Sequence, residues 1–451
     1  YDNLPGITYE SFVIEGKTYK FAQDVPCLIP EILAELKAFR KQAKKDMAKA
    51  TGQMKQVYNG KQLAYKVSMN SVYGFTGAGK GMLPCVPIAA TVTCEGRHMI
   101  EQTKELVERE FAGAKVRYGD SVTPDTPLLV RINGVVKTVR IDSLVSEYQN
   151  RTDGKEVGLV DAEVWTEKGF TSIEQVVRHK TTKKIYRVLT HTGVVDVTED
   201  HSLLLSDATK ISPNQVTLET QLLHGDCVKA LGNCSDTVTP EEAKVMGFFY
   251  GDGSCGSYNN KHTWALNNSN LDYLYEMQGL CPFETRIYDT LGSSGVYKLN
   301  AVGDVKNISQ RYRDLFYNSE KEKIVPPCIL NGSDDIIRSF WEGYYMADGY
   351  TRMDNKGKEG SMGIYLLGRR LGFNVSLNTR SDKLNVFRQT WTKSNFRKDP
   401  TAIKKIEYLG ETDDYVYDLT TESHHFHVGP GDLVVHNTDS VMVEFDMQGR
   451  T

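Results

Sequence analysis

The chain has 451 residues, of which 40% are hydrophobic and 25% are charged, and a formal net charge of −4. This length exceeds what one ordinary hydrophobic core supports, so we expect two to four domains in a globular protein. No apolar run is long enough to cross a bilayer and the first residues lack the features of a signal peptide, so we expect an intracellular protein with no membrane partner. The charge gives no global support for nucleic-acid binding, so any contact with DNA must come from local basic patches.

The eight cysteines are scattered along the chain and form no Cys-x-x-Cys pair. This pattern predicts reduced thiols in a reducing compartment, either nuclear or cytoplasmic. It disfavours both a disulfide framework and a zinc site.

The first element predicted with a clear periodicity is a helix over residues 29–50. Its apolar side chains recur at helical spacing and Pro30 suits the first turn. The second half is basic and includes Arg40 and Lys44. Taken alone, such a charged half is explained by a solvated helix face.

A second helix, over residues 62–74, places three side chains on one face. Lys66, Asn70 and Tyr73 are spaced i, i+4 and i+7. A lysine supplies a point charge for a triphosphate, and a tyrosine ring can pack against the sugar and base of a nucleotide. The string Lys-x-x-x-Asn-Ser-x-Tyr-Gly resembles in full the fingers-helix motif of family B DNA polymerases. That resemblance implies that these three residues bind an incoming nucleotide, with help from Arg40 and Lys44.

A further polymerase signal is split between two distant places in the chain. Residues 117–121 read Arg-Tyr-Gly-Asp-Ser, and residues 436–440 read His-Asn-Thr-Asp-Ser. If residues 121–437 were removed, Asp120 would join Thr438 and the seam would read Tyr-Gly-Asp-Thr-Asp-Ser. That string resembles the metal-binding turn of the same polymerase family. The middle of the chain therefore resembles an intein, and the two ends resemble its exteins.

The residues beside this seam predict a hairpin in the joined product. Apolar side chains alternate before Asp120 and after Asp439, which places the two carboxylates at the tip. The resemblance implies that this pair holds Mg²⁺ for nucleotidyl transfer on a primer–template in the full polymerase. The family's other metal-binding motif and its exonuclease domain are absent from the sequence, so we expect no DNA polymerisation by this chain alone.

Between the junctions, local patterning predicts a β-rich domain. Apolar residues alternate over 128–132 and continue after Asn133-Gly134, a pair that favours a tight hairpin turn. A second hairpin is predicted over residues 185–197, and a strand over residues 415–420. We therefore predict an all-β domain whose two parts are separated by a long insertion.

Four short blocks in this domain resemble, in order, the blocks of an intein with the Hint fold. Each block is weak alone, because a Thr-x-x-His string occurs by chance. Their order, and their position across an interrupted polymerase motif, make the resemblance specific. The blocks contain Ser121, then Thr198 and His201, then Asp418 and His424, and finally His436 and Asn437, followed by Thr438.

The residue types fit the chemistry of splicing at the first junction. An insert that attacks the peptide bond before it needs a hydroxyl or thiol at its first position, here Ser121 Oγ acting on the Asp120 carbonyl. The amide nitrogen leaves only when protonated, and His201, oriented with help from Thr198, is the expected acid. The hydroxyl of Thr438 then attacks the resulting ester.

The second junction requires a side-chain amide next to its own peptide bond. Asn437 is expected to attack its own backbone carbonyl and form a succinimide, with His436 and His424 as proton donors. Asp418 and His424 are the expected helpers in positioning and proton transfer during the ester exchange. No cofactor is expected, because peptide bonds are exchanged and proximity replaces a bimolecular encounter, with effective molarities of ~10⁵ M or more.

Two interpretations of Ser121 stay open. Inteins more often begin with cysteine, and a serine hydroxyl is a poorer nucleophile because it is far from ionised at neutral pH. Ser121 is therefore either a substitution for cysteine that traps the precursor, or a native serine that works with Thr438.

The long insertion contains two related strings that resemble the repeated motif of LAGLIDADG homing endonucleases, at residues 245–253 and 341–349. Small residues at i and i+4 in each string allow two helices to pack closely, and each helix then delivers one carboxylate, Asp252 or Asp348, to a shared edge. The resemblance implies an α/β endonuclease domain in which this pair holds Mg²⁺. Lys323 would assist the cleavage of double-stranded DNA at a homing site.

The predicted chain is thus multidomain: an all-β Hint splicing domain, interrupted by an α/β LAGLIDADG endonuclease domain and flanked by an α-rich or mixed palm and fingers fragment of a polymerase. We expect a monomer. The rival function is a polymerase fragment with a DNA-binding or endonuclease insertion that does not splice. The predicted domains are residues 1–120 and 438–451 for the polymerase segments, 121–235 and 396–437 for the splicing domain, and 236–395 for the endonuclease domain.

Overall fold

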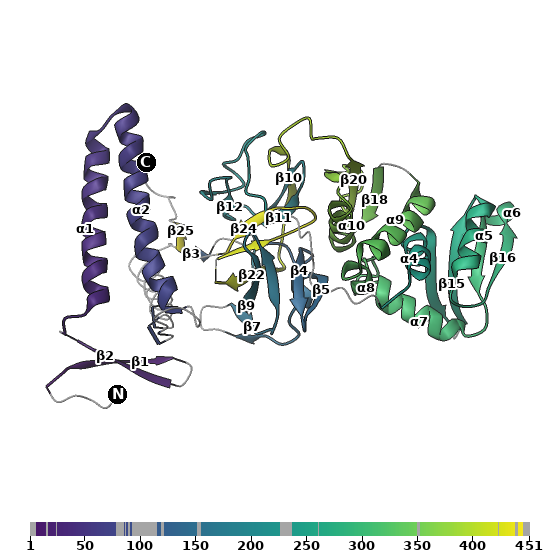
Figure 1. The fold of residues 1–451 in the computed structure, drawn as a ribbon, viewed down its shortest axis with the longest axis horizontal. Helices are drawn as coiled ribbons and strands as arrows, with labels where there is room; N and C mark the ends of the chain where they lie inside the picture. The colour runs from purple at the N-terminus through teal and green to yellow at the C-terminus, as the bar shows by residue number, and fades with distance from the viewer. Residues whose placement is uncertain are drawn as a thin grey trace. The chain divides into compact units, whose positions relative to one another are not determined.

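A computed structural model of the chain shows two compact units, Tyr1–Arg117 with Val441–Thr451, and Tyr118–Ser440. Its elements are labelled in Figure 1. The structure describes residues 6–14, 17–23, 25–77, 85, 87–88, 91–92, 115–118, 121–150, 155–225, 237–259, 261–349, 352–422, 424–437 and 441–444.

The first unit contains a hairpin and two long helices. Its hairpin strands β1 and β2 pair antiparallel, and both helices expected from the sequence are confirmed. The helices contact each other through the rings of Phe39 and Tyr65, whose centroids are 5.7 Å apart. The bounds are β1 (Tyr9–Ile14), β2 (Lys17–Ala22), α1 (Leu28–Lys49) and α2 (Gly52–Gly77).

Two short strands that are far apart in the sequence lie side by side. β3 (Lys115–Tyr118) and β25 (Val441–Glu444) are hydrogen-bonded neighbours in a two-stranded sheet. The pairing expected in the joined product is therefore already present with the long insert in place. The predicted tip residues Asp120 and Asp439 lie outside the described residues.

The second unit begins with the two hairpins predicted from alternating apolar residues. β4 (Pro127–Ile132) and β5 (Val135–Arg140) pair antiparallel around Asn133 and Gly134, which have φ values of 51° and 79°. Two left-handed residues give the turn whose twist matches a hairpin. β10 (Lys184–Thr190) and β11 (Val194–Thr198) form the second hairpin.

Strands from both sides of the insertion pair with each other. β21 pairs with β10, β22 with β9, and β24 with both β12 and β23. Residues far apart in the sequence, such as Val122, Val188 and Phe426, share one buried core. The strands of this β body are β6 (Gln149–Asn150), β7 (Glu156–Gly158), β8 (Glu163–Thr166), β9 (Gly169–Lys180), β12 (Leu203–Leu204), β13 (Lys210–Ile211), β21 (Ile403–Glu411), β22 (Tyr415–Thr421), β23 (His425–His427) and β24 (Val434–His436), with the 3-10 helix η1 (Ile141–Ser143).

The inserted part of the second unit mixes helices with two sheets. One sheet has the strand order β14-β15-β17-β16 and the other has the order β18-β20-β19. Its elements are α4 (Pro240–Asp252), β14 (Gly253–Tyr258), β15 (Lys261–Asn268), α5 (Leu271–Leu280), β16 (Thr285–Thr290), α6 (Leu291–Ser294), β17 (Val296–Ala301), α7 (Val305–Phe316), α8 (Pro327–Leu330), α9 (Asp334–Asp348), β18 (Arg352–Lys356), α10 (Lys358–Arg370), β19 (Asn374–Thr379) and β20 (Val386–Thr392).

Helices α4 and α9 cross at very close range. A Cβ on Gly247 would overlap the carbonyl oxygen of Phe340, and a Cβ on Gly343 would overlap that of Lys244. The close helix contact expected from the small residues is therefore confirmed. The last residue of α4 is Asp252 and the last residue of α9 is Asp348, so the crossing also fixes the positions of these two aspartates.

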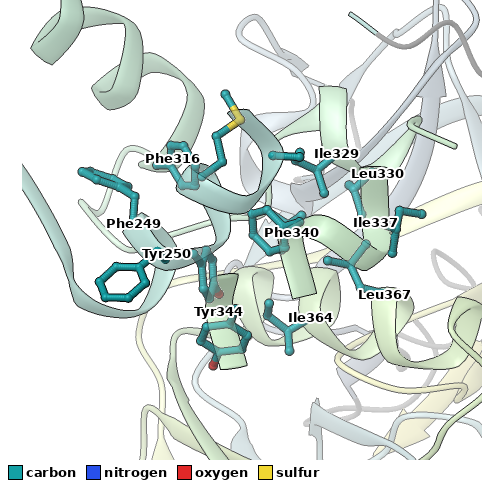
Figure 2. Close-up of a cluster of buried hydrophobic side chains, with 14 of the residues drawn as sticks. Phe249, Tyr250, Phe316, Ile329, Leu330, Ile337, Phe340, Tyr344, Ile364 and Leu367 are labelled. Carbon is teal, nitrogen blue, oxygen red and sulfur yellow. The ribbon is translucent and has the colours of Figure 1, made fainter. Parts of the chain in front are cut away.

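An apolar core surrounds this helix crossing. Figure 2 shows Tyr250 of α4 and Tyr344 of α9 gathered with Ile364 of α10. All three side chains are buried. This packing holds α10 against the helix pair. Among the helices that the structure describes, none combines the length and apolar character needed to span a membrane.

Candidate functional site

The residue expected to start splicing is held in the middle of the β body. Ser121 is 2% exposed. The next residue, Val122, exchanges two main-chain hydrogen bonds with Tyr417 of β22, at 2.9 and 3.0 Å, and also bridges to Val197 of β11. The segment that follows the first junction is therefore fixed on both sides by strands.

The Thr-x-x-His block lies directly beside Ser121. The Thr198 amide donates to the Ser121 carbonyl oxygen at 3.1 Å, and the Thr198 hydroxyl lies 3.5 Å from the same oxygen. The His201 amide donates to the Thr198 carbonyl oxygen at 3.0 Å. Thr198 thus contacts His201 through the main chain, while its hydroxyl faces the junction.

The His201 ring is fully buried, and neither ring nitrogen has a hydrogen-bond partner within the described part of the chain. Burial lowers the pKa of His201 to about 3, although Asp200 opposes this shift. The ring is therefore neutral at pH 7. This changes the expectation that His201 is a ready-made acid, because a neutral imidazole must first take up a proton before it can deliver one.

The second junction is built around Asn437, which is 3% exposed. Its side-chain nitrogen donates to the Leu419 carbonyl oxygen at 2.8 Å, and its side-chain oxygen lies 3.1 Å from His424 Nδ1. The Asn437 amide also donates to the His424 carbonyl oxygen at 2.8 Å. His424 has a φ of 58°, an uncommon left-handed conformation that brings both its ring and its carbonyl to Asn437.

Two further histidines border this junction. The buried His436 ring lies with its centroid 6.2 Å from that of His424 and 5.4 Å from that of His425. Burial, and then Lys210 and His425, lower the pKa of His436 to about 3, so this ring is also neutral at pH 7. The motif blocks assigned no splicing role to His425, although it directly follows His424. Its Nδ1 lies 3.0 Å from Glu167 Oε1.

One strand brings the two junctions together. Val122 pairs with Tyr417 of β22, and Asn437 bonds to Leu419, two residues farther along the same strand. Two residues of strand span only ~7 Å. Asp418 lies between these contacts, and its carboxylate accepts a 2.8 Å hydrogen bond from the Leu419 amide. Thr438, the expected second nucleophile, lies outside the described residues.

The carboxylates expected in the inserted domain lie near a half-buried lysine, Lys323, close enough for their charges to influence one another. Burial, assisted by Asp348, raises the pKa of Asp252 to about 6, and Asn268 donates to its carboxylate at 2.7 Å. Burial also raises the pKa of Asp348. Burial lowers the pKa of Lys323 to about 8, while the two aspartates oppose that shift.

The ammonium group of Lys323 binds main-chain carbonyl oxygens at the C-terminal end of α4. It donates to four main-chain carbonyl oxygens over 2.8 to 3.1 Å. Two carboxyl groups whose pKa values are both raised fit a hard divalent cation, which would favour their ionised forms. In the described part of the chain, no cluster of three or more histidine, cysteine or acidic side chains is arranged to hold a metal. The acceptors of Lys323 are the carbonyl oxygens of Phe249, Tyr250, Gly251 and Gly253.

The expected nucleotide residues lie on α1 and α2. Lys44 and Lys66 are exposed, and Arg40 is half-buried with its Nε 3.4 Å from Gln62 Oε1. The side chains of Asn70 and Tyr73 lie outside what the structure describes. Arg40 is therefore tied to the neighbouring helix, whereas the two lysines remain exposed to solvent.

Comparison with known proteins gives two family matches. The intein splicing domain matches residues 130–437, which is most of the chain, and DNA polymerase family B matches residues 2–135. A DNA polymerase of Acanthamoeba polyphaga mimivirus is 42% identical over 96% of this chain and 27% of the relative. A DNA polymerase of Thermococcus hydrothermalis is 27% identical over 82% of this chain and 26% of the relative. The chain thus spans about a quarter of the length of these polymerases.

Among solved structures, an intein from a hyperthermophile has 12% sequence identity and a TM-score of 0.28, covering 71% of this chain and 100% of that one. Variants of the homing endonuclease I-DmoI have 15% identity and a TM-score of 0.26, covering 34% of this chain and 88% of theirs. The family matches place a splicing domain next to polymerase sequence, as the interrupted motif predicts. The chain belongs to the intein splicing family, and its splicing domain lies within a segment of a family B DNA polymerase.

Proposed function

We propose that the chain excises residues 121–437 by autocatalytic splicing and joins Asp120 to Thr438. The observation that carries this proposal is the position of both junctions on β22, where Val122 and Asn437 bind to residues only two apart. Ester exchange between the junctions requires such proximity, which replaces a bimolecular encounter.

The first step joins Ser121 to the carbonyl carbon of Asp120. Ser121 Oγ attacks that carbon, the bond from Asp120 to the Ser121 nitrogen breaks, and an ester and a free amine form. Because the His201 ring is neutral at pH 7, we infer that it takes the proton from the attacking hydroxyl and passes it to the leaving nitrogen. The Thr198 contacts to the Ser121 carbonyl oxygen support a fixed orientation of the residue that attacks.

The later steps exchange and release the ester. The hydroxyl of Thr438 attacks the ester carbonyl and frees the Ser121 hydroxyl, with Asp418 placed beside the junction to assist. The Asn437 side-chain nitrogen then attacks its own carbonyl carbon, which breaks the bond to Thr438 and leaves a succinimide. His424 orients the side-chain amide, and neutral His436 is placed to donate a hydrogen bond during cleavage. The joined ester rearranges to an amide by an O-to-N shift.

Mass analysis of freshly made protein over time tests this proposal. Splicing yields a product of residues 1–120 joined to 438–451 and a free insert of residues 121–437. A Ser121→Ala chain is the matched control and should form no ligated product. Ser121→Cys should splice faster if serine is a trap, and at a similar rate if serine is native. Persistence of the intact chain in both the parent and Ser121→Cys would refute splicing and favour the rival, non-splicing function.

We propose a second activity, Mg²⁺-dependent cleavage of double-stranded DNA by the inserted domain. Its support is the position of Asp252 and Asp348 at the ends of the crossing helices α4 and α9, near Lys323, together with the raised pKa values of both carboxyl groups. The aspartates would hold the metal ion, which supplies charge stabilisation at the scissile phosphate when bound. Lys323 would hold the end of α4 in place and add positive charge near that phosphate.

The DNA activity is tested on a plasmid that encodes the uninterrupted seam around Asp120 and Thr438. Nicking should require Mg²⁺ and disappear in an Asp348→Asn chain. Nicking that persists in EDTA would refute the proposed metal site.

A polymerase role belongs to the full host protein and not to this chain alone. There, we propose that Lys66, Asn70 and Tyr73 would bind a nucleotide, with Arg40 and Lys44 nearby. After splicing, Asp120 and Asp439 would share Mg²⁺ on a primer–template.

A further inference from the structure

A buried lysine of the inserted domain reaches the segment that follows the first splicing junction. Lys358, the first residue of α10, is 3% exposed. Its ammonium group donates to Thr123 Oγ1 at 2.9 Å, to Asp125 Oδ1 at 2.5 Å and to Asp196 Oδ2 at 2.8 Å. Thr123 and Asp125 are only two and four residues after Ser121.

The carboxylates around Lys358, the partly exposed Asp125 and the buried Asp196, belong to a network that also includes Arg187 and Arg140. Arg187 binds Asp196 through two hydrogen bonds of 2.7 Å. The Asp196 carbonyl oxygen also accepts a 3.1 Å hydrogen bond from the Thr123 amide. The network thus contacts both the junction segment and β11, the strand that bridges to Val122.

Lys358 favours the ionised forms of both carboxylates in this network. Burial would raise the pKa of Asp125, but Lys358, together with Thr123 and Arg140, lowers it to about 2. Burial opposes ionisation of Asp196 as well, and Lys358 and Arg187 together lower its pKa. Removing the lysine takes away the cation that binds both carboxylates and leaves the buried Asp196 with Arg187 alone, and a less compensated buried charge makes neighbouring groups move or take up protons.

We propose that Lys358 is a positioning residue for the first splicing step, supplied by the inserted domain to hold Ser121 against the Asp120 carbonyl. The inference rests on the proposed splicing function. The alternative is that the ion pairs only hold the two domains together. That alternative predicts equal effects at both junctions. Positioning predicts an effect at the first junction alone, because none of the contacts of Lys358 within the described part of the chain involves Asn437 or His424.

The test measures the two junctions separately in the full chain. With Asn437→Ala, the reaction stops before release, and hydroxylamine reports the ester. It attacks the Asp120 carbonyl carbon, the ester bond to Ser121 Oγ, or to the Thr438 hydroxyl oxygen after ester exchange, breaks, and residues 1–120 leave as a hydroxamic acid; both esters require the first step. With Ser121→Ala, release of residues 438–451 reports cyclisation of Asn437. Lys358→Met should slow the hydroxylamine cleavage by about 10- to 100-fold, since a misplacement of ~1 Å near reacting atoms costs on the order of 10²-fold.

Lys358→Met should leave the rate at which residues 438–451 are released within about twofold of the parent rate. A release rate in this range would also show that the splicing domain of the variant is folded. Lys358→Arg keeps the charge and should restore most of the hydroxylamine cleavage. Arg370→Met is the matched control, because Arg370 is a buried cation on the same helix that binds carbonyl oxygens of Leu330 and Gly332 within the inserted domain. It should leave both rates near the parent values.

Three results would overturn the inference. The first is that hydroxylamine cleaves the Lys358→Met chain at the parent rate. The second is that Lys358→Met slows hydroxylamine cleavage and the release of residues 438–451 equally. The third is an equal slowing of hydroxylamine cleavage by Arg370→Met. A failure of the proposed function looks different: hydroxylamine then cleaves neither the parent nor its Ser121→Cys form, whatever residue occupies position 358.

Discussion

The burial of a neutral His201 ring predicts a specific dependence of stability on pH. In the folded chain burial lowers the pKa of this ring to about 3, against 6.5 for an exposed histidine. The unfolded chain therefore binds the proton first as the pH falls. The stabilisation is fully present above pH 6.5 and is lost as the pH falls from 6.5 toward 3.

The magnitude follows from the two pKa values. Between pH 7 and pH 5, one such histidine lowers the free energy of unfolding by about 2 kcal/mol. His201→Phe keeps a ring of similar size without a titrating group, and no hydrogen bond is lost because the described residues offer the ring nitrogens none. The variant should therefore lose about 2 kcal/mol less than its parent over the same pH interval.

Urea unfolding at pH 7 and pH 5 measures this difference, with Ser121→Ala and Asn437→Ala in every chain to keep it in one piece. The unfolding is followed by a probe of the β body, because the chain has more than one unit. Phe426→Leu is the matched control, because Phe426 is fully buried in the β body and does not titrate. The free energy of unfolding of this variant should fall between pH 7 and pH 5 by the same amount as that of the parent. An unchanged loss in His201→Phe would refute a neutral buried ring.

Three other predictions concern separate parts of the molecule. Gly343→Ala should lower the free energy of unfolding by about 1–3 kcal/mol, because the new Cβ overlaps a backbone oxygen. Gly279→Ala in α5 is the control: its Cβ meets no atom within 4 Å, so the change should be neutral or stabilising by up to ~1 kcal/mol. A denaturation experiment that ranks the two variants in the opposite order contradicts the close helix crossing. Asn437→Ala should abolish release of residues 438–451 while hydroxylamine cleavage at the first junction continues, and any free peptide in a mass spectrum argues against Asn cyclisation. Asp252→Asn should abolish Mg²⁺-dependent nicking of the seam plasmid and leave the amount of spliced product unchanged; retained nicking would move the nuclease site elsewhere.

Much of the local structure could be predicted from short patterns. Asn133-Gly134 specifies a hairpin because a two-residue turn with two left-handed residues favours that pair, and both strands formed as expected. Gly247 and Gly343 predicted the close helix crossing, because two backbones that approach closely leave no room for a Cβ. These features depend on neighbouring residues or on the size of one side chain, which the sequence states directly.

The candidate site was only partly predictable. Motif blocks pointed to His201 and His424, but not to the neutral state of the His201 ring or to the contacts of either residue. His424 reaches Asn437 through a left-handed backbone, and His201 is neutral because the folded domain excludes water from its ring. Lys358 carried no motif at all, and its partner Thr123 lies 235 residues away in the sequence.

The sequence by itself determined which groups stand beside the two bonds that the proposed splicing reaction breaks. A hydroxyl at Ser121 and a side-chain amide at Asn437 stand next to the bonds that must break, and that adjacency is a property of the chain before it folds. Only the tertiary structure decided that residues next to both junctions bind the same strand, β22, and that Lys358 from the inserted domain reaches the segment that follows the first junction. The physical reason is that burial and long-range pairing depend on the packing of the whole unit, whereas bond connectivity does not.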